Sequence, residues 1–325
     1  MLQELFRIPF INWPIHSFGL MMVLGLLAAM QVAKMLARRS RIDPEFFVNA
    51  GLLALVSGVV GARISHVIEN FRQYTRADRS VIDNLWAAVN LGDGGLTYYG
   101  GFLLAFPTLV VYAIIKKVPV RVGMDVVAPC LMIALGIGRV GCFLNGCCYG
   151  APCQAPWAVT FPYHSYAYVD GYRQGHVDPP PQLLIFDEGR GPRPMTPAEV
   201  RMHADLTDDA SLIHLATQQR SHRVHPAQLY SAFTALLLAA VLIAYFTLPH
   251  AAGNVFSVML ILEGLARFNL EMLRVEPPVM PELFGRMSFA MVLSIGMIAL
   301  GTAMWFLFRA WSPRYANPAI SPTPA

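Results

Sequence analysis

Charged residues are scarce in this chain of 325 residues. Only 14% of the residues are Asp, Glu, Lys or Arg, whereas 55% are hydrophobic, and the mean hydropathy is +0.48. Soluble domains carry roughly 25% charged residues, so the composition excludes an ordinary soluble domain and predicts an integral membrane protein. The net charge is only +4 and no motif indicates nucleic-acid binding, so we expect no nucleic-acid partner.

The first apolar run also lacks the pattern of a cleavable signal peptide. Its positive charges follow the run, at Lys34, Arg38 and Arg39, whereas a signal peptide carries them in front. Apolar segments of about 20 residues cross a bilayer as helices. Seven are predicted, at residues 14–36, 46–67, 96–115, 122–143, 226–248, 255–272 and 287–308. The expected fold class is an all-α integral membrane protein, a bundle of seven transmembrane helices in a single domain over residues 1–317.

The distribution of basic residues predicts the orientation, because Lys and Arg in short loops accumulate on the cytoplasmic side. With the N-terminus outside and the C-terminus cytoplasmic, the inner side receives Lys34, Arg38, Arg39, Arg41, Lys116, Lys117, Arg121, Arg309 and Arg314. Polar residues at about 69–93 then form an external arm, and those at about 151–224 form an external head insertion. The tail at 318–325, rich in Pro and Ala, is predicted to be disordered.

An unusual polar motif ends the fourth apolar segment. An arginine and an asparagine stand among four glycines, in the order Gly138, Arg139, Gly141, Asn145, Gly146 and Gly150. A guanidinium is a rigid, permanently charged fork for phosphate or carboxylate, and glycine lets backbone approach a ligand closely. An arginine that only reaches toward lipid head groups is the alternative. The glycines favour a ligand site.

Charged residues recur in the sixth segment. Glu263, Arg267, Glu271 and Arg274 are spaced by three and four residues and therefore share one helical face. They can neutralise one another as ion pairs, or they can be functional, as ionisable residues at membrane depth often are. Both interpretations remain open for Glu263 and Glu271. Arg267, deeper in the segment, is the better candidate for binding an anion.

Two further motifs stand at predicted outer helix starts. Tyr98 and Tyr99 precede Gly100 and Gly101 at the third segment, where tyrosine alone is an ordinary interfacial residue but the glycines suggest close approach of a bulky group. At the fifth segment, the motif comprises His225, Pro226, Gln228, Leu229 and Tyr230. His225 can bind a ligand or merely cap the helix.

The chain has five cysteines and no CxxC spacing. Cys142, Cys147, Cys148 and Cys153 cluster in sequence, with Cys130 deeper in the fourth segment. Because no CxxC or histidine pattern supports zinc, we expect small packing residues, with one disulfide as the second choice. No metal and no cofactor are expected.

Taken in order, these motifs resemble the bacterial prolipoprotein diacylglyceryl transferase family, over nearly the whole chain. The matching residues are Tyr99, Gly100, Gly101, Asp125, Ala128, Pro129, Gly138, Arg139, Val140, Gly141, Asn145, Gly146, Gly150, Trp157, Phe161, Pro162, His225, Pro226, Gln228, Leu229, Tyr230, Arg267, Phe268, Glu271, Arg274, Glu276 and Pro277.

The resemblance implies a seven-helix enzyme of the bacterial inner membrane. Such an enzyme transfers the diacylglyceryl group of phosphatidylglycerol to the thiol of the lipobox cysteine in a prolipoprotein signal peptide, forming a thioether and releasing glycerol phosphate. Membrane lipids and the prolipoprotein are then its partners. The resemblance assigns phosphatidylglycerol binding to Arg139 and an essential role to Arg267.

Other residues receive roles from the same resemblance. Those that shape the lipid site are Gly100, Gly101, Asn145, Gly146 and Gly150. Those that support it are Asp125, His225, Gln228, Tyr230, Glu271 and Arg274.

Several positions depart from the family pattern. Tyr99 stands where a histidine is common, and tyrosine, with a pKa near 10, is a poor base at neutral pH. We predict that Tyr99 is catalytic by orienting the lipid, while the charge of the arginines lowers the pKa of the substrate thiol. His66 and His225 are alternative bases.

A second departure lies in the first segment, where Phe18 replaces a common tyrosine. These losses keep open a non-catalytic paralogue that binds lipid or lipoprotein, whereas a transporter would show internal repeats, which are absent.

Overall fold

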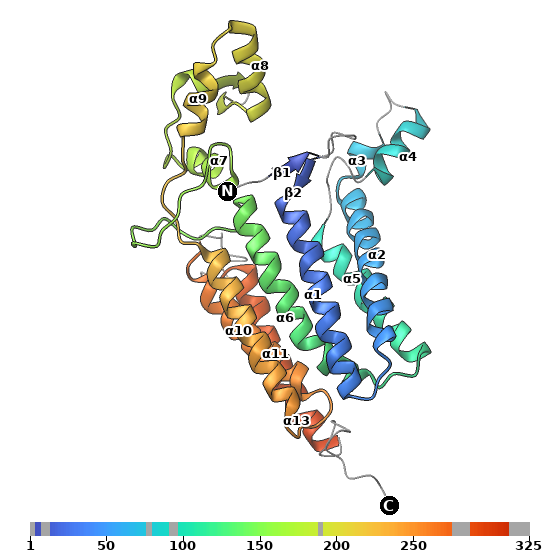
Figure 1. Ribbon diagram of the computed structural model, residues 1–325. Coiled ribbons are helices and arrows are strands. Elements are labelled where there is room, and N and C mark those ends of the chain that lie inside the picture. The colour runs from blue at the N-terminus through green and yellow to red at the C-terminus, as the bar shows by residue number, and fades with distance from the viewer. Residues whose placement is uncertain are drawn as a thin grey trace, which may run out of the picture. The chain divides into compact units, whose positions relative to one another are not determined.

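The computed structural model describes residues 4–7, 14–75, 80–90, 97–187, 191–274 and 287–311 (Figure 1). Its long helices are α1 (Ser17–Arg39), α2 (Pro44–Glu69), α5 (Tyr98–Ile115), α6 (Val120–Asn145), α10 (Ala227–Thr247), α11 (Asn254–Glu271) and α13 (Phe289–Trp311). Each apolar segment predicted from the sequence coincides with one of these helices. The prediction of a mostly helical fold is therefore confirmed.

Five of these helices, α1, α2, α6, α10 and α13, are long and apolar enough to cross a membrane. The protein is thus an integral membrane protein with several candidate spans. The other two have 18 residues each. Charged side chains at Glu263, Arg267 and Glu271 lower the hydropathy of α11, so the full count of seven spans stays a prediction.

The first segment begins differently from the prediction. Instead of starting a helix at residue 14, Pro14–His16 forms strand β2, which pairs antiparallel with β1 (Glu4–Arg7), and α1 begins only at Ser17. Hydropathy cannot separate a short apolar strand from the helix that follows it, so the predicted boundary was wrong by three residues.

The chain divides into two compact units, which are described separately. Unit 1 comprises Met1–Leu27, Leu131–Leu242 and Ser257–Ala303, and unit 2 comprises Ala28–Cys130, Ile243–Phe256 and Met304–Ala325. The polar motifs of α6, α10 and α11 belong to unit 1. The Gly-Gly motif of α5 and Asp125 belong to unit 2.

In unit 2, helices α2 and α5 lie side by side (Figure 1). A Cβ atom added to Gly100 would meet the Ser65 side chain and would lie 2.5 Å from the Gly61 carbonyl oxygen, while one on Gly101 would lie 3.0 Å from the Gly58 oxygen. Small residues at a membrane helix crossing let two backbones approach closely. Gly100 and Gly101 are therefore needed for this helix contact.

The predicted arm contains two short helices, α3 (Phe71–Tyr74) and α4 (Val81–Val89). The side chain of Ser80 caps α4 by accepting a hydrogen bond from the Asp83 amide, which satisfies one of the free donors at the helix start. Trp86 is 70% exposed on this helix.

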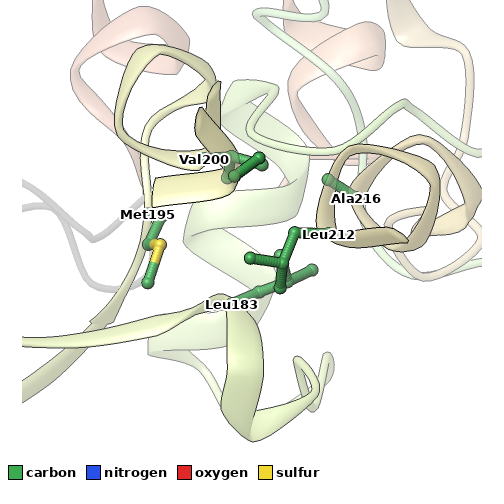
Figure 2. Close-up of a cluster of buried hydrophobic side chains, with 6 residues drawn as sticks. Leu183, Met195, Val200, Leu212 and Ala216 are labelled. Carbon is green, nitrogen blue, oxygen red and sulfur yellow. The ribbon is translucent and has the colours of Figure 1, made fainter. Parts of the chain in front are cut away.

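The predicted head, between α6 and α10, is a folded subdomain of unit 1. It contains α7 (Tyr166–Arg173), η1 (Pro181–Leu183), the antiparallel strands β3 (Leu184–Asp187) and β4 (Gly191–Pro194), α8 (Pro197–Thr207) and α9 (Ser211–Gln218). Figure 2 shows its hydrophobic core, made by Leu183, Met195, Val200, Ala204, Leu212 and Ala216. A capping box between Thr196 and Glu199 starts α8.

Candidate active site

The polar motif of the fourth segment begins where α6 ends. The Gly146 amide donates to the Phe143 oxygen and the Cys147 amide donates to the Cys142 oxygen, both at 3.2 Å, and Gly146 has φ +75°. This pair of hydrogen bonds with a left-handed glycine is a Schellman motif, a common helix end. A Cβ on Gly146 would also lie 3.1 Å from the Phe161 ring. Gly146 is thus needed to end the helix.

The loop after α6 is fixed by two other predicted motifs. The Gly150 amide donates to the His225 oxygen at 2.9 Å, and the fully buried Gln228 side chain donates to the Cys147 oxygen at 2.8 Å. A Cβ on Gly150 would lie 2.9 Å from the Leu273 oxygen, just beyond α11. Three motifs distant in sequence therefore meet in unit 1, and Gln228 acts as a positioning residue for the loop.

The glycines of this motif have packing roles as well. A Cβ on Gly141 would lie 2.9 Å from the Met21 side chain and 3.3 Å from that of Phe18 in α1, whereas one on Gly138 would meet only Met22, at 3.5 Å. From the sequence alone, these glycines favoured a ligand site. The close approach of α1 side chains accounts for Gly141, and contact of any of these glycines with lipid stays a proposal.

On α11, the charged residues form the ion pairs that the spacing allowed. Glu271 lies 3.3 Å from Arg267 and 3.6 Å from Arg274, and it accepts a hydrogen bond from Ser288 at 3.3 Å. Its side chain is 1% exposed, whereas that of Arg267 is 23% exposed. Glu271 therefore forms the ion pairs that the spacing allowed, with two arginines, and a functional role for it stays a prediction. Glu276 lies outside the described residues.

Arg139 and Arg267 both interact electrostatically with a second carboxylate of α11, that of Glu263. Glu263 interacts electrostatically with Arg139 and with Arg267, so both positive charges lie within reach of the same group. Within the part of the chain that the structure describes, Arg139 has no salt bridge of its own. A pocket opens between α10 and α11 here, and its lining residues are Ser231, Thr234, Glu263, Ala266, Arg267 and Leu270. The hollow is small, and its lining mixes hydroxyl, carboxylate and guanidinium groups with apolar atoms.

Three cysteines gather beside this arginine. The sulfur atoms of Cys142, Cys147 and Cys148 all lie within 4.8 Å of one another, and all three cysteines are free and half-buried. Hydrogen bonds from the other two thiols, and then the positive charges of Arg139 and Arg274, lower the pKa of Cys148.

These cysteines also cluster in the sequence, but the absence of a CxxC or histidine pattern there gave no support for a metal site. The Schellman motif places Cys142 and Cys147 at the two positions whose side chains commonly touch. Cys148, with φ +61°, follows at once, and Asn145 hydrogen-bonds to Cys147. Gly146, two residues beyond the last apolar residue of the helix, Leu144, could have signalled this helix end.

Asp125, in unit 2, has a structural role. Its carboxylate accepts hydrogen bonds from the Gly253 amide at 2.7 Å and the Phe256 amide at 3.0 Å, which caps the start of α11. It also lies 3.6 Å from His250. Burial alone would lower the pKa of His250, but hydrogen bonds to Asp125 and to the Leu248 oxygen outweigh it and raise that pKa.

The candidate bases differ in how they are held. The side chains of Tyr98 and Tyr99 lie outside the described residues. His225 faces Tyr230, with 3.3 Å between its Nδ1 and the Tyr230 hydroxyl, and His66 lies 3.4 Å from the Asn70 amide group. Tyr230 thus orients the ring of His225 next to the loop of the α6 motif.

Two arginines that act electrostatically on one carboxylate are an unusual charge cluster in a multi-pass membrane protein, and ionisable residues in such segments commonly mark a functional site. The chain belongs to the prolipoprotein diacylglyceryl transferase family, whose model matches residues 3–307.

Curated relatives agree with the family. A protein of Clostridium tetani is 26% identical over 263 residues, covering 81% of this chain and 82% of the relative. One of Corynebacterium glutamicum (strain ATCC 13032) is 26% identical, covering 91% and 80%, and one of Nostoc sp. is 24% identical, covering 91% and 86%. Each of these relatives is named phosphatidylglycerol–prolipoprotein diacylglyceryl transferase.

Proposed function

We propose that this protein transfers the diacylglyceryl group of phosphatidylglycerol to the lipobox cysteine of prolipoproteins, the first step of lipoprotein maturation. Family membership supports the reaction. The observation that carries it is the pair of arginines, Arg139 on α6 and Arg267 on α11, which both act electrostatically on Glu263. Two such cations suit a lipid phosphate.

In this proposal the arginines stabilise the leaving group. The substrate thiolate attacks the glyceryl carbon, a C–S bond forms, and the C–O bond to phosphate breaks. The electron pair leaves with glycerol phosphate, whose charge Arg139 and Arg267 stabilise. Glu271 holds Arg267 and Arg274 in place, and Gln228 and His225 hold the loop that carries Asn145, Gly146 and Gly150.

The thiol must lose its proton, because the thiolate is the nucleophile. Tyr99 orients the lipid in this proposal, and the charge of the arginines lowers the pKa of the substrate thiol. His225, oriented by Tyr230, is the better placed of the two candidate histidine bases. Gly100 and Gly101 act through the contact of α5 with α2.

The site faces exported substrate in the proposed topology. Basic residues end α1 at Arg38 and Arg39 and lie near the end of α13 at Arg309, and Lys116 follows α5. Placing these residues in the cytoplasm puts the N-terminus, the arm and the head outside. A lipobox signal peptide emerging from the membrane would meet the site from that side.

Substitution of Arg139 tests the proposal. In a purified assay with phosphatidylglycerol and a lipobox peptide, Arg139→Ala is expected to lower kcat/KM by about 100-fold or more, the usual loss for one oxyanion-stabilising donor. Helix content and elution volume in detergent should be unchanged. Arg173→Ala removes a control arginine with a 73% exposed side chain and should leave transfer unchanged. Wild-type protein that binds the lipid without transferring it would instead indicate the non-catalytic paralogue.

A further inference from the structure

The cluster of Cys142, Cys147 and Cys148 has the dimensions of a metal site. With Zn–S bonds of about 2.3 Å and tetrahedral angles, the sulfur atoms of a zinc site are about 3.8 Å apart. The three sulfurs here lie within 4.8 Å of one another before any ion draws them together. Small side-chain rotations therefore suffice to bind one ion.

Backbone contacts, which do not involve the thiols, hold the three cysteines in this geometry. The Schellman motif brings Cys142 and Cys147 together, and the Cys147 oxygen accepts a hydrogen bond from Gln228. Cys148 adopts a left-handed conformation at φ +61°, which is costly for a residue other than glycine and turns its sulfur onto the other two. The side chain of Asn145 hydrogen-bonds to Cys147, as outer groups do to metal ligands.

The electrostatic surroundings also fit. Three thiolates and a divalent cation leave one net negative charge, and Arg139 and Arg274 both act electrostatically on Cys148. These two cations would stabilise the loaded site. Among the described residues, no histidine or carboxylate completes the cluster, so one tetrahedral position stays open. Zinc sites with three protein ligands keep that position for water or substrate.

We propose that Cys142, Cys147 and Cys148 form a three-thiolate site for a soft divalent cation of the Zn²⁺ class, with its fourth position open to a thiol from outside the chain. This revises the expectation of packing cysteines without metal. That expectation came from sequence spacing, which says nothing of how a helix end folds.

The role of the open position rests on the proposed transferase function. A substrate thiol that binds there releases its proton to water, because a coordinating thiol is deprotonated. The resulting thiolate attacks the glyceryl carbon, and the electron pair of the broken C–O bond leaves with glycerol phosphate. The ion would thus supply the deprotonation for which Tyr99, with an ordinary pKa near 10, is poorly suited.

Cobalt titration tests the site itself. We would reduce the full-length protein in detergent, remove metal, and add Co²⁺ while recording the thiolate-to-cobalt charge-transfer absorption. One equivalent is expected to bind, and Zn²⁺ should abolish the band. Cys142→Ser, Cys147→Ser and Cys148→Ser should each weaken or remove it, whereas Cys153→Ser, outside the cluster, should retain it.

Three results would overturn the site. These are no thiolate band in the wild type, the same band in the triple serine variant, or a disulfide between two of the three cysteines in protein isolated without reductant. Alkylation and mass spectrometry detect the last of these. Circular dichroism of each variant separates loss of the site from loss of the fold.

A peptide tests the open position. A lipobox peptide with its cysteine should add intensity to the cobalt band as a fourth thiolate binds, and the matching serine peptide should not; identical spectra with both peptides would refute an open position. Arg267→Ala separates the two proposals, since it should retain the cobalt band and lose transfer. Loss of transfer alone therefore contradicts neither metal binding nor the peptide response.

Discussion

Arg63 and Arg139 are both arginines of candidate membrane helices, yet they have different surroundings. Arg63 on α2 is 7% exposed. Its guanidinium donates to the Ala88 oxygen at 2.8 Å and to the Ala87 oxygen at 2.7 Å, and it stacks 5.4 Å from the centre of the Tyr74 ring. Arg139 on α6 is half-buried, and it interacts electrostatically with Glu263 and with Cys148 of the cysteine cluster.

The difference shows how to interpret an intramembrane arginine. Charge at membrane depth is costly, so depth alone would make either residue a functional candidate, although only Arg139 stands in a motif that the sequence analysis singled out. Arg63 binds carbonyl oxygens at the end of α4, which lack partners within that helix, so it holds the arm in place. Arg139 lies near a pocket and thiols. The chemistry of the partners, rather than depth, separates a structural arginine from a site.

The largest expected effect concerns Arg267. Like Arg63 it has fixed partners within the protein, and like Arg139 it acts on Glu263. Arg267→Ala is expected to lower kcat/KM by about 100-fold or more. Arg267→Lys keeps a positive charge for Glu271 but loses the planar fork, and should still lose about 10-fold, at an unchanged Tm. Transfer assays and thermal unfolding measure the two effects.

Arg274→Lys serves as the matched control, because Arg274 also pairs with Glu271 but does not line the pocket. If Arg267→Lys transfers as well as wild type, then Arg267 belongs with Arg63 as a structural residue. A lower Tm in Arg267→Lys would likewise indicate a structural role for Arg267.

Local patterns predicted much of this fold. Apolar runs of about 20 residues located the long helices, and the spacing of Arg267, Glu271 and Arg274 predicted ion pairs on one helical face, as the structure has them. Both depend on the period of a single helix, which sequence alone contains.

Contacts between residues far apart in the sequence could not be predicted from it. Gln228 binds a carbonyl 81 residues away, and Asp125 caps α11 across 128 residues. The roles of Gly100 and Gly146 likewise depend on Ser65 and Phe161, which one sequence does not place beside them. A glycine can serve a ligand, a turn or a helix contact, and only its neighbours decide which.

A smaller effect tests the structural arginine. Arg63→Ala removes two hydrogen bonds to α4. A single charge-assisted bond is worth roughly 1.5–3 kcal/mol, and two bonds from one guanidinium are not additive, so local opening of Val81–Val89 should become easier by about 2 kcal/mol. Amide hydrogen exchange in this helix should accelerate by about 30-fold, with transfer nearly unchanged. Arg72→Ala, at an exposed arginine of α3, is the control and should change neither. A loss of transfer as large as that of Arg139→Ala would remove the contrast between the two arginines.

The smallest expected effect separates packing from lipid contact in α5, the helix that packs against the helix of Arg63, α2. Gly100→Ala would place a methyl group against Ser65 and the Gly61 oxygen, so α2 and α5 must separate, at about 1–3 kcal/mol as for other overpacked interiors. Gly58→Ala is the matched control, because a Cβ there meets nothing within 4 Å. Thermal unfolding in detergent should show a lower Tm for Gly100→Ala only, and transfer per folded molecule should change little. An unchanged Tm with lost transfer would instead place Gly100 against the lipid, because a helix contact that tolerates the methyl group cannot be the reason for glycine.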